Sequence, residues 1–331
     1  MGELVGPQLC IAIIFVVICA HVAYTAVDLF DSYFRLPPHF IPIVYDLKLS
    51  LSSKKESICG QVRIEMQCIQ STSEVLLHAN PLFVKVQHAI IENRLTNETV
   101  DLGMPAVDWN RYLVAFNSSI VFDHAAVYYL SIWFQTTYAD SHGGLIKYED
   151  KERGVWASTL FEPTNARRLF PCFDEPRWRS IFKLQLWLED DFASARYVAL
   201  SNTAGTYKHW NERLTIWGFD PTPPIPTYLL AITLGQFVSI CSAENFDSEI
   251  CIWRFAKVEG WNETAHRIIR TMAEFQICFN LLFLISMLYL IDVDFAVRRL
   301  VFLRCCMIFS RSSEPRTKSD FVSFEVRTKE S

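Results

Sequence analysis

The sequence predicts an all-β fold, a saddle-like sandwich built from many strands. Every second residue is apolar at Val62, Ile64, Met66 and Cys68, and the same period of two runs through residues 127–134, as in β-strands. Clusters of turn-forming residues at 52–57, 93–97 and 221–226 separate such runs. Aromatic residues make up 14% of the 331 residues and amphipathic helix patterns are almost absent before Ala265, which favours strands over helices.

An apolar segment at residues 9–27, LCIAIIFVVICAHVAYTAV, opens the chain and predicts a helix long enough to span a bilayer. Glu3 precedes this segment and the first basic residue is Arg35, so the positive start of a typical signal peptide is missing. We favour a signal anchor over a cleaved signal peptide for residues 1–27. Either would place the rest of the chain outside the cell, at the plasma membrane or secreted.

Three N-x-[ST] sequons follow this apolar segment, at Asn97, Asn117 and Asn262. Such tripeptides accept N-linked glycans when a chain enters the secretory pathway. We therefore expect a glycoprotein that is modified at one or more of these asparagines.

The strand at residues 127–134 is apolar on both faces, which predicts that it is covered on both sides. Cys59 and Cys68 lie on one predicted strand, where nine extended residues span about 30 Å. A disulfide requires Cα atoms within about 7 Å, so these two cysteines cannot pair with each other. Cys172 is expected to be a buried free thiol.

A disulfide is predicted between Cys241 and Cys251. The segment FVSICSAENFDSEICIWRF, residues 237–255, has two apolar runs around a polar turn at 244–248. A hairpin centred on Phe246 places the two cysteines opposite each other, with Cα atoms about 4.5 to 5.5 Å apart. A register slipped by one residue would instead leave two free thiols on opposite faces.

A second apolar run, residues 275–291, is shorter and contains Gln276 and Asn280. A run of this length is more often a buried helix than a membrane span, and both interpretations stay open. The following tail changes character abruptly, as an alternative exon, a retained intron or a mistaken gene model would produce. The fold is thus expected to end in a short helical tail that cannot be assigned to a known domain.

Five sequence blocks carry a resemblance to a known family. They are RLPPHFIPIVYDLKL (35–49), VLLHAN (75–80), GGLIKY (143–148), FEPTNARRLFPCFDEP (161–176) and FDPTPPIPTYLLAITLGQF (219–237). In this order and spacing they resemble the β-rich N-terminal domain of the aminopeptidase N family of zinc metallopeptidases. The resemblance implies that this domain covers residues 33–255, that 256–280 begin a truncated catalytic domain, and that 281–331 form a divergent tail with a possible second membrane segment.

The family's chemistry needs a zinc ion that polarises the scissile carbonyl and activates a water molecule. Its sequence mark is H-E-x-x-H on a helix, and the family also uses a G-A-M-E-N loop. None of the eight histidines begins H-E-x-x-H, and the G-A-M-E-N loop is absent as well. These 331 residues are therefore expected to contain no catalytic residues, no metal site and no cofactor.

One substrate contact of the family falls inside the resembling blocks. The family pattern is Thr-Gln-x-Glu-Pro, whose Gln and Glu hold the first residue of a peptide and its α-amine. Glu162 is retained in this sequence, whereas Leu160 replaces the Gln and cannot make the hydrogen bonds of an amide. Alternatively, Glu162 pairs with Arg167 or Arg168 and only holds the loop.

Three further polar residues of these blocks are expected to be structural. His78 is predicted to be a satisfied core or edge histidine. Asp174 and Glu175 precede Pro176 and are predicted to shape a turn, because Asp bonds nearby backbone amides. Two adjacent carboxylates without further ligands would make a poor metal site.

Three functions stay open for this sequence. The first is a non-catalytic ectodomain that binds peptides, or a partner protein through the surface that faces the catalytic domain in the family. The second is a truncated product of an active zinc metalloaminopeptidase that removes N-terminal residues from peptides, and the third is an adhesion or receptor module. A membrane contact is expected through residues 9–27. No nucleic acid partner is expected, because the pI is near 5.9 and basic patches are absent.

Overall fold

The computed structural model describes residues 34–140, 142–151, 153–241, 251–255, 283–285 and 307–309. The chain divides into two compact units, Met1–Pro37 and Pro38–Ser331. Only residues 34–37 of the first unit are described, and every named strand lies in the second. None of the helices in the described ranges is long and apolar enough to cross a bilayer. The predicted apolar helix at residues 9–27 lies outside these ranges.

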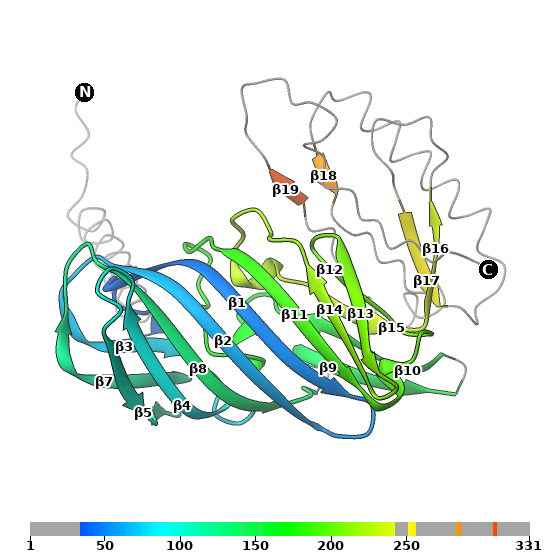
Figure 1. Ribbon diagram of the computed structural model, residues 1–331, viewed down its shortest axis with the longest axis horizontal. Helices are drawn as coiled ribbons and strands as arrows, with labels where there is room; N and C mark the ends of the chain where they lie inside the picture. Colours follow the sequence, from blue (N-terminus) through cyan, green and yellow to red (C-terminus); the bar gives the residue numbers. More distant parts are fainter. Residues whose placement is uncertain are drawn as a thin grey trace, which may run out of the picture. The chain divides into compact units, whose positions relative to one another are not determined.

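The largest sheet has eight strands in the order β13-β14-β11-β1-β2-β8-β4-β5. All neighbours are antiparallel except β1 and β11, which run parallel and lie side by side in Figure 1. The strands are β1 Phe40–Ser52, β2 Ser57–Cys68, β4 Lys85–Asn93, β5 Thr99–Gly103, β8 Val127–Thr137, β11 Ile181–Glu189, β13 Gly205–Asn211 and β14 Leu214–Phe219.

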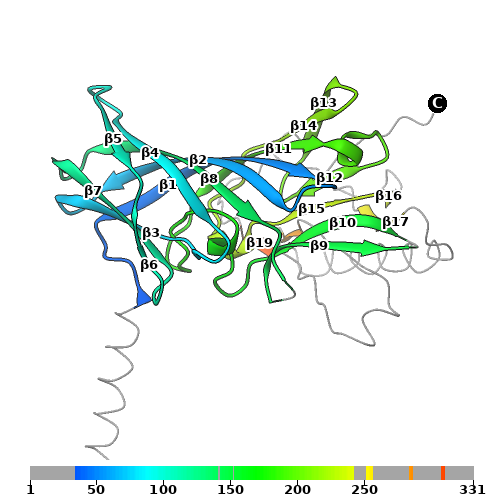
Figure 2. The ribbon, with the colours of Figure 1, turned by 90° about the horizontal axis from the view of Figure 1, so that it is seen from below.

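A four-stranded sheet has the order β12-β15-β10-β9, and Figure 2 shows β9 and β10 as a separate layer beside β1 and β2. Its strands are β9 Gly144–Asp150, β10 Gly154–Leu160, β12 Val198–Ser201 and β15 Ile232–Gly235. A three-stranded sheet has the order β3-β7-β6, with β3 Thr72–His78, β6 Ala106–Asp108 and β7 Leu113–Phe122. Three short 3-10 helices connect strands: η1 Ala166–Arg168, η2 Asp190–Ala193 and η3 Thr227–Leu229. The predicted all-β class is confirmed for the described residues.

Strand β8 has one buried face and one partly exposed face. Leu130, Ile132 and Phe134 are at most 1% exposed, whereas Tyr129 and Trp133 on the other face are only half-buried. The prediction that this strand is covered on both sides is therefore wrong. Tyrosine and tryptophan tolerate such positions because each has an apolar ring and a polar tip.

The region after β15 contains two strand pairs. β16 Phe237–Cys241 pairs with β17 Cys251–Phe255, and a disulfide joins Cys241 to Cys251 in the predicted register. β18 Phe283–Ile285 pairs with β19 Met307–Phe309, so the helix predicted for residues 275–291 is wrong at these three positions. Phe and Ile favour the pleated strand surface, which explains the difference. Residues 256–282, 286–306 and 310–331 lie outside the described ranges.

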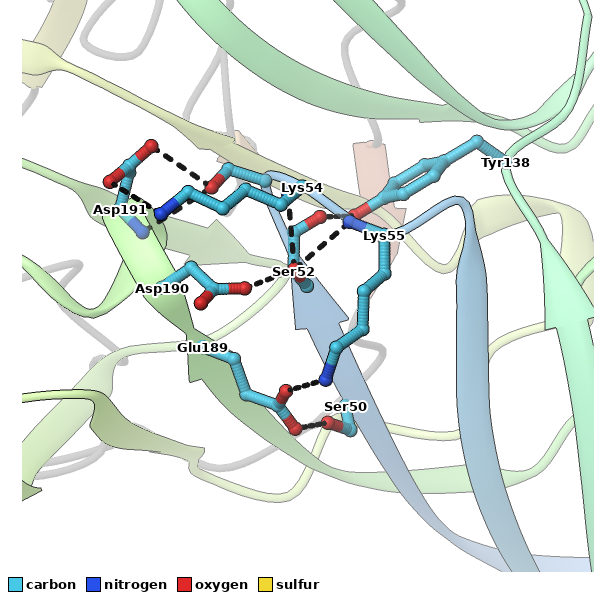
Figure 3. A network of polar contacts seen from close by, with 9 residues as sticks. Ser50, Ser52, Lys54, Lys55, Tyr138, Glu189, Asp190 and Asp191 are labelled. Carbon is cyan, nitrogen blue, oxygen red and sulfur yellow. Dashed lines mark hydrogen bonds and ion pairs between the residues drawn. The ribbon is translucent and has the colours of Figure 1, made fainter.

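The turn that joins β1 to β2 is bound to the end of β11 (Figure 3). Ser50 Oγ donates to Glu189 Oε1 at 2.5 Å, and Ser52 Oγ donates to Asp190 Oδ2 at 2.6 Å. Lys55 Nζ lies 2.8 Å from Glu189 Oε2, which completes what we call the turn clamp. The clamp fixes the register of the parallel β1–β11 pair at its last residues, where Ser52 is the partner of Glu189.

Candidate functional site

The candidate site is the loop of residues 161–168, which we call the Glu162 loop. It follows β10, whose last residue, Leu160, pairs with Gly144 of β9. The Leu160 side chain is 37% exposed and thus open to a ligand, and Glu162 is half-buried. The two residues that the sequence singled out therefore lie at the open end of one strand.

Asn165 gives the Glu162 loop its tight bend. Its backbone N–H donates to the Phe161 carbonyl at 2.6 Å, and its side-chain Nδ2 donates to the Glu162 carbonyl at 2.8 Å. The amide group of Asn165 fits against Gly143, where a Cβ atom would stand 2.4 Å from Nδ2. Gly143 also has a φ of +117°, which L side chains rarely adopt.

Arg167 extends from the loop into the core. Its Nε donates to Asp174 Oδ2 at 2.9 Å and its Nη2 to the Asp174 carbonyl at 2.9 Å. Thr227 Oγ1 donates to the other carboxylate oxygen, Asp174 Oδ1, at 2.7 Å. The Arg167 and Asp174 side chains are 12% and 1% exposed, so this Arg167–Asp174–Thr227 network is buried.

Arg168 extends the opposite way, toward the connection between β8 and β9. Its Nη1 donates to Asp140 Oδ1 and to the Gly143 carbonyl, both at 3.2 Å. Its guanidinium carbon lies 5.1 Å from the centre of the Phe83 ring. The two arginines thus hold the loop from both sides, while a pairing of Glu162 with either of them stays a prediction.

Asp174 does more than shape a turn, and the prediction for it was incomplete. It does accept a hydrogen bond from the Arg167 backbone N–H at 3.3 Å, yet its shorter bonds go to two side chains far from Pro176. Its neighbour Glu175 is also buried and pairs with Arg177, Oε2 to Nε, at 2.6 Å. Sequence reasoning missed this network because no spacing rule connects an arginine and an aspartate across a loop.

His78 and Cys172 are buried core residues, as predicted. They exchange backbone hydrogen bonds of 2.9 and 3.0 Å, and His78 Nδ1 accepts one from the Asp174 N–H at 3.3 Å. Burial and then the Asp174 carboxylate raise the pKa of the Cys172 thiol well above its ordinary value. A protonated, inaccessible thiol is not a nucleophile, so this cluster has a structural role.

The predicted glycosylation sites differ in what the structure describes. Asn97 is exposed in the turn between β4 and β5, with a φ of +57°, and Asn117 is exposed on β7. Asn262 lies outside the described residues. Both described asparagines are thus accessible to a modifying enzyme, and their modification stays a prediction.

A family profile described as Peptidase M1 N-terminal domain matches residues 41–229, more than half of the chain. The chain belongs to the peptidase M1 family. This finding confirms the resemblance carried by the five sequence blocks. The matched range of the M1 domain contains the Glu162 loop and the whole Arg167–Asp174–Thr227 network.

Curated relatives of this M1 chain are similar over about two thirds of its length. Aminopeptidase Q of Homo sapiens is 31% identical over 243 residues, which are 66% of this chain and 24% of that protein. Aminopeptidase M1 of Arabidopsis thaliana is 31% identical over 216 residues, 63% and 24% of the two chains. Endoplasmic reticulum aminopeptidase 1 of Homo sapiens is 28% identical over 212 residues, which are 62% of this chain and 22% of that protein. The M1 chain thus spans about a quarter of these relatives.

The residues of this M1 chain do not fit the family's zinc ion. The sequence contains no H-E-x-x-H, the arrangement that supplies two imidazole ligands and a general base. Within the described ranges no three His, Cys, Asp or Glu side chains come together in a way that could hold a metal ion. No reaction step through zinc can therefore be assigned to these residues.

Proposed function

We propose that this chain is an M1 ectodomain that binds peptides and does not itself cleave them. The observation that carries the proposal is the placement of Glu162 beside the exposed Leu160, at the open end of β10 and in a loop held from two sides. A carboxylate makes strong charge-assisted hydrogen bonds with an ammonium group. Glu162 would bind the α-amine of a peptide, and Leu160 would contact an apolar first side chain.

A second candidate is a role within an active zinc metalloaminopeptidase that removes N-terminal residues from peptides. It is favoured by the names of the relatives, which are aminopeptidases. In that case the zinc ligands would be encoded by further exons of the same gene. Sequencing of transcripts past the codon for Phe279 tests this candidate, because an in-frame H-E-x-x-H would support it.

We also propose that the domain lies outside the cell, either anchored at the plasma membrane or secreted. The apolar residues 9–27 support export, and the exposure of Asn97 and Asn117 agrees with a glycosylated surface. The same apolar segment would provide the membrane contact.

Peptide binding by the full chain, produced in a secretory host, tests the leading proposal. The probe is an alanine hexapeptide with fluorescein at its C-terminus, compared with its N-acetylated form by fluorescence anisotropy. We expect tighter binding of the free amine, and Glu162→Gln should remove that preference because the charge is lost. Glu98→Gln, in the exposed β4–β5 turn, is the matched control and should keep the preference. Equal affinity of the unmodified protein for both peptides would contradict the proposal.

Catalysis is tested on the same preparation. After dialysis we expect no stoichiometric zinc and no hydrolysis of aminoacyl amides, since the sequence lacks the metal-binding helix. Leu160→Gln should restore no activity, because one substrate contact cannot replace a metal. Bound zinc together with chelator-sensitive hydrolysis would overturn the non-catalytic assignment.

A further inference from the structure

The buried carboxylate of Asp174 is a specific connection between the core and the Glu162 loop. Its side chain is 1% exposed, and its two oxygens accept from different elements, Oδ2 from Arg167 in η1 and Oδ1 from Thr227 in η3. A buried charge is costly unless it is paired and hydrogen-bonded. The network therefore favours one position of the loop strongly over others.

Arg167 connects the Glu162 loop to neighbouring parts of the core through hydrogen bonds. Its carbonyl accepts a hydrogen bond from the Asn80 backbone N–H at 2.7 Å, just after β3. Its own side chain is held by Asp174, and two residues before it Asn165 bonds the Glu162 carbonyl. Pro163 and Thr164, which follow Glu162 in the loop, are exposed, whereas Phe161 before it is buried against the Phe170 ring.

We propose that Asp174 and Arg167 are positioning residues that preset the Glu162 loop for its ligand. The inference rests on the proposed peptide binding and adds that the carboxylate geometry is fixed from the core before any peptide arrives. A loop that is ordered in advance loses less conformational entropy when it binds, which strengthens binding. Both residues act on the ligand only through the Glu162 loop.

Hydrogen exchange of the full chain, followed by mass spectrometry, tests the positioning directly. Asp174→Asn keeps the size of the side chain but leaves Arg167 buried without its counter-charge. We expect the amides of residues 161–168 to exchange at least about tenfold faster in this variant. Thr227→Val, which removes a single buried hydroxyl, should accelerate them about fivefold.

Thr215→Val is the matched control for this experiment. Thr215 is equally buried, and its hydroxyl donates to the Ala193 carbonyl at 2.7 Å, in a part of the sheet away from the loop. It should leave exchange at 161–168 within about twofold of the unmodified protein. If Asp174→Asn does not fold, Thr227→Val decides the question by itself. Unchanged loop exchange in the Thr227→Val variant would overturn the inference.

The peptide assay connects positioning to binding. Asp174→Asn should reduce the preference for the free amine over the acetylated peptide, whereas the control Thr215→Val should leave it unchanged. A lost preference with unchanged loop exchange would overturn the inference, because Asp174 would then act by another route. If the unmodified protein shows no preference, the proposed peptide binding fails, and the exchange data alone decide whether Asp174 holds the loop.

Discussion

The three free cysteines of the described part differ in accessibility. Cys59 is exposed on β2, whereas Cys68 and Cys172 are buried. Burial raises the pKa of the Cys68 thiol as well as that of Cys172. Because the thiolate is the reactive form, reactivity requires both access and deprotonation. The three thiols should therefore differ clearly in their reactivity toward an alkylating reagent.

We expect iodoacetamide to modify Cys59 in the folded protein and to leave Cys68 and Cys172 unmodified. Mass spectrometry of a digest assigns each site, and labelling in urea serves as the control in which all three react. Modification of Cys172 at the rate of Cys59 under native conditions would contradict the described core.

Glu189 should give the turn clamp a pH dependence. Hydrogen bonds from Lys55 and Ser50 lower the pKa of this carboxyl in the folded state. Its contribution to stability is therefore fully present above the ordinary pKa of about 4.3 and is lost as the pH falls through the lower folded pKa. The pair is largely exposed to solvent, so the contribution should be small.

Urea unfolding at about pH 6 and at about pH 3 measures this effect, because the two values lie on either side of the ordinary pKa of a Glu carboxyl. Glu189→Gln should destabilise the protein at the higher pH and have less effect at the lower one. Glu98→Gln, at an exposed position of the β4–β5 turn, should show no such change with pH. An equal loss for Glu189→Gln at both pH values would rule out the charge as its cause.

Glu162 could be chosen as a candidate from its sequence pattern, but the network that holds its loop could not be predicted. A motif identifies a residue whose neighbours along the chain are diagnostic, as Thr159 and Pro163 are for Glu162. The network of Arg167 and Asp174 depends on how the loop folds back and on Thr227 from a distant connection. No local propensity encodes a contact between residues 53 apart.

Strand β2 contains a glycine whose lack of a side chain is required by its partner strand. Gly60 pairs with Phe134 of β8, and a Cβ atom on Gly60 would stand 2.2 Å from that ring. The phenylalanine ring lies over the glycine, an arrangement that fills the space left by the missing side chain. A larger residue at position 60 must therefore displace a buried aromatic ring.

Gly60→Ala should destabilise the protein by about 1 to 3 kcal/mol, the range typical of overpacked cores. Gly218→Ala is the matched control, because nothing lies within 4 Å of the corresponding Cβ position in β14. Chemical denaturation of both variants measures the difference. Combining Gly60→Ala with Phe134→Leu should recover part of the loss, and no recovery would argue against the ring as its cause.

The alternation of apolar residues predicted the positions of the strands better than it predicted which strand faces are buried. β2 and β8 are where the period of two places them, and the turns at 52–57 and 93–97 separate strands as expected. Alternation could not show which face is covered, because Tyr129 and Trp133 count as apolar while they tolerate water. Arg63, whose guanidinium lies 4.0 Å from the centre of the Tyr129 ring, occupies that outer face instead of a second layer.

Export of the whole molecule should be visible as a change in mass. In a glycosylating host, endoglycosidase treatment should lower the apparent mass of the full chain on a gel. Combined Asn97→Gln, Asn117→Gln and Asn262→Gln should abolish that shift, because no sequon remains. Asn110→Gln, at an exposed position that belongs to no sequon, is the control. An unshifted band from the unmodified protein would count against entry into the secretory pathway.

The parallel pair of β1 and β11 has a consequence for the order in which the chain can fold during synthesis. Val44 is the partner of Ile181, so one edge of β1 lacks its neighbour until well over a hundred further residues have been made. At the usual 5 to 20 residues per second, this delay lasts roughly 7 to 27 s. Strands β1 and β2 can pair before β11 has been made, and the free edge of β1 can then pair with other chains. A chaperone that covers the β1 edge during this interval would raise the yield of folded protein, and slower translation before residue 181 would lower it.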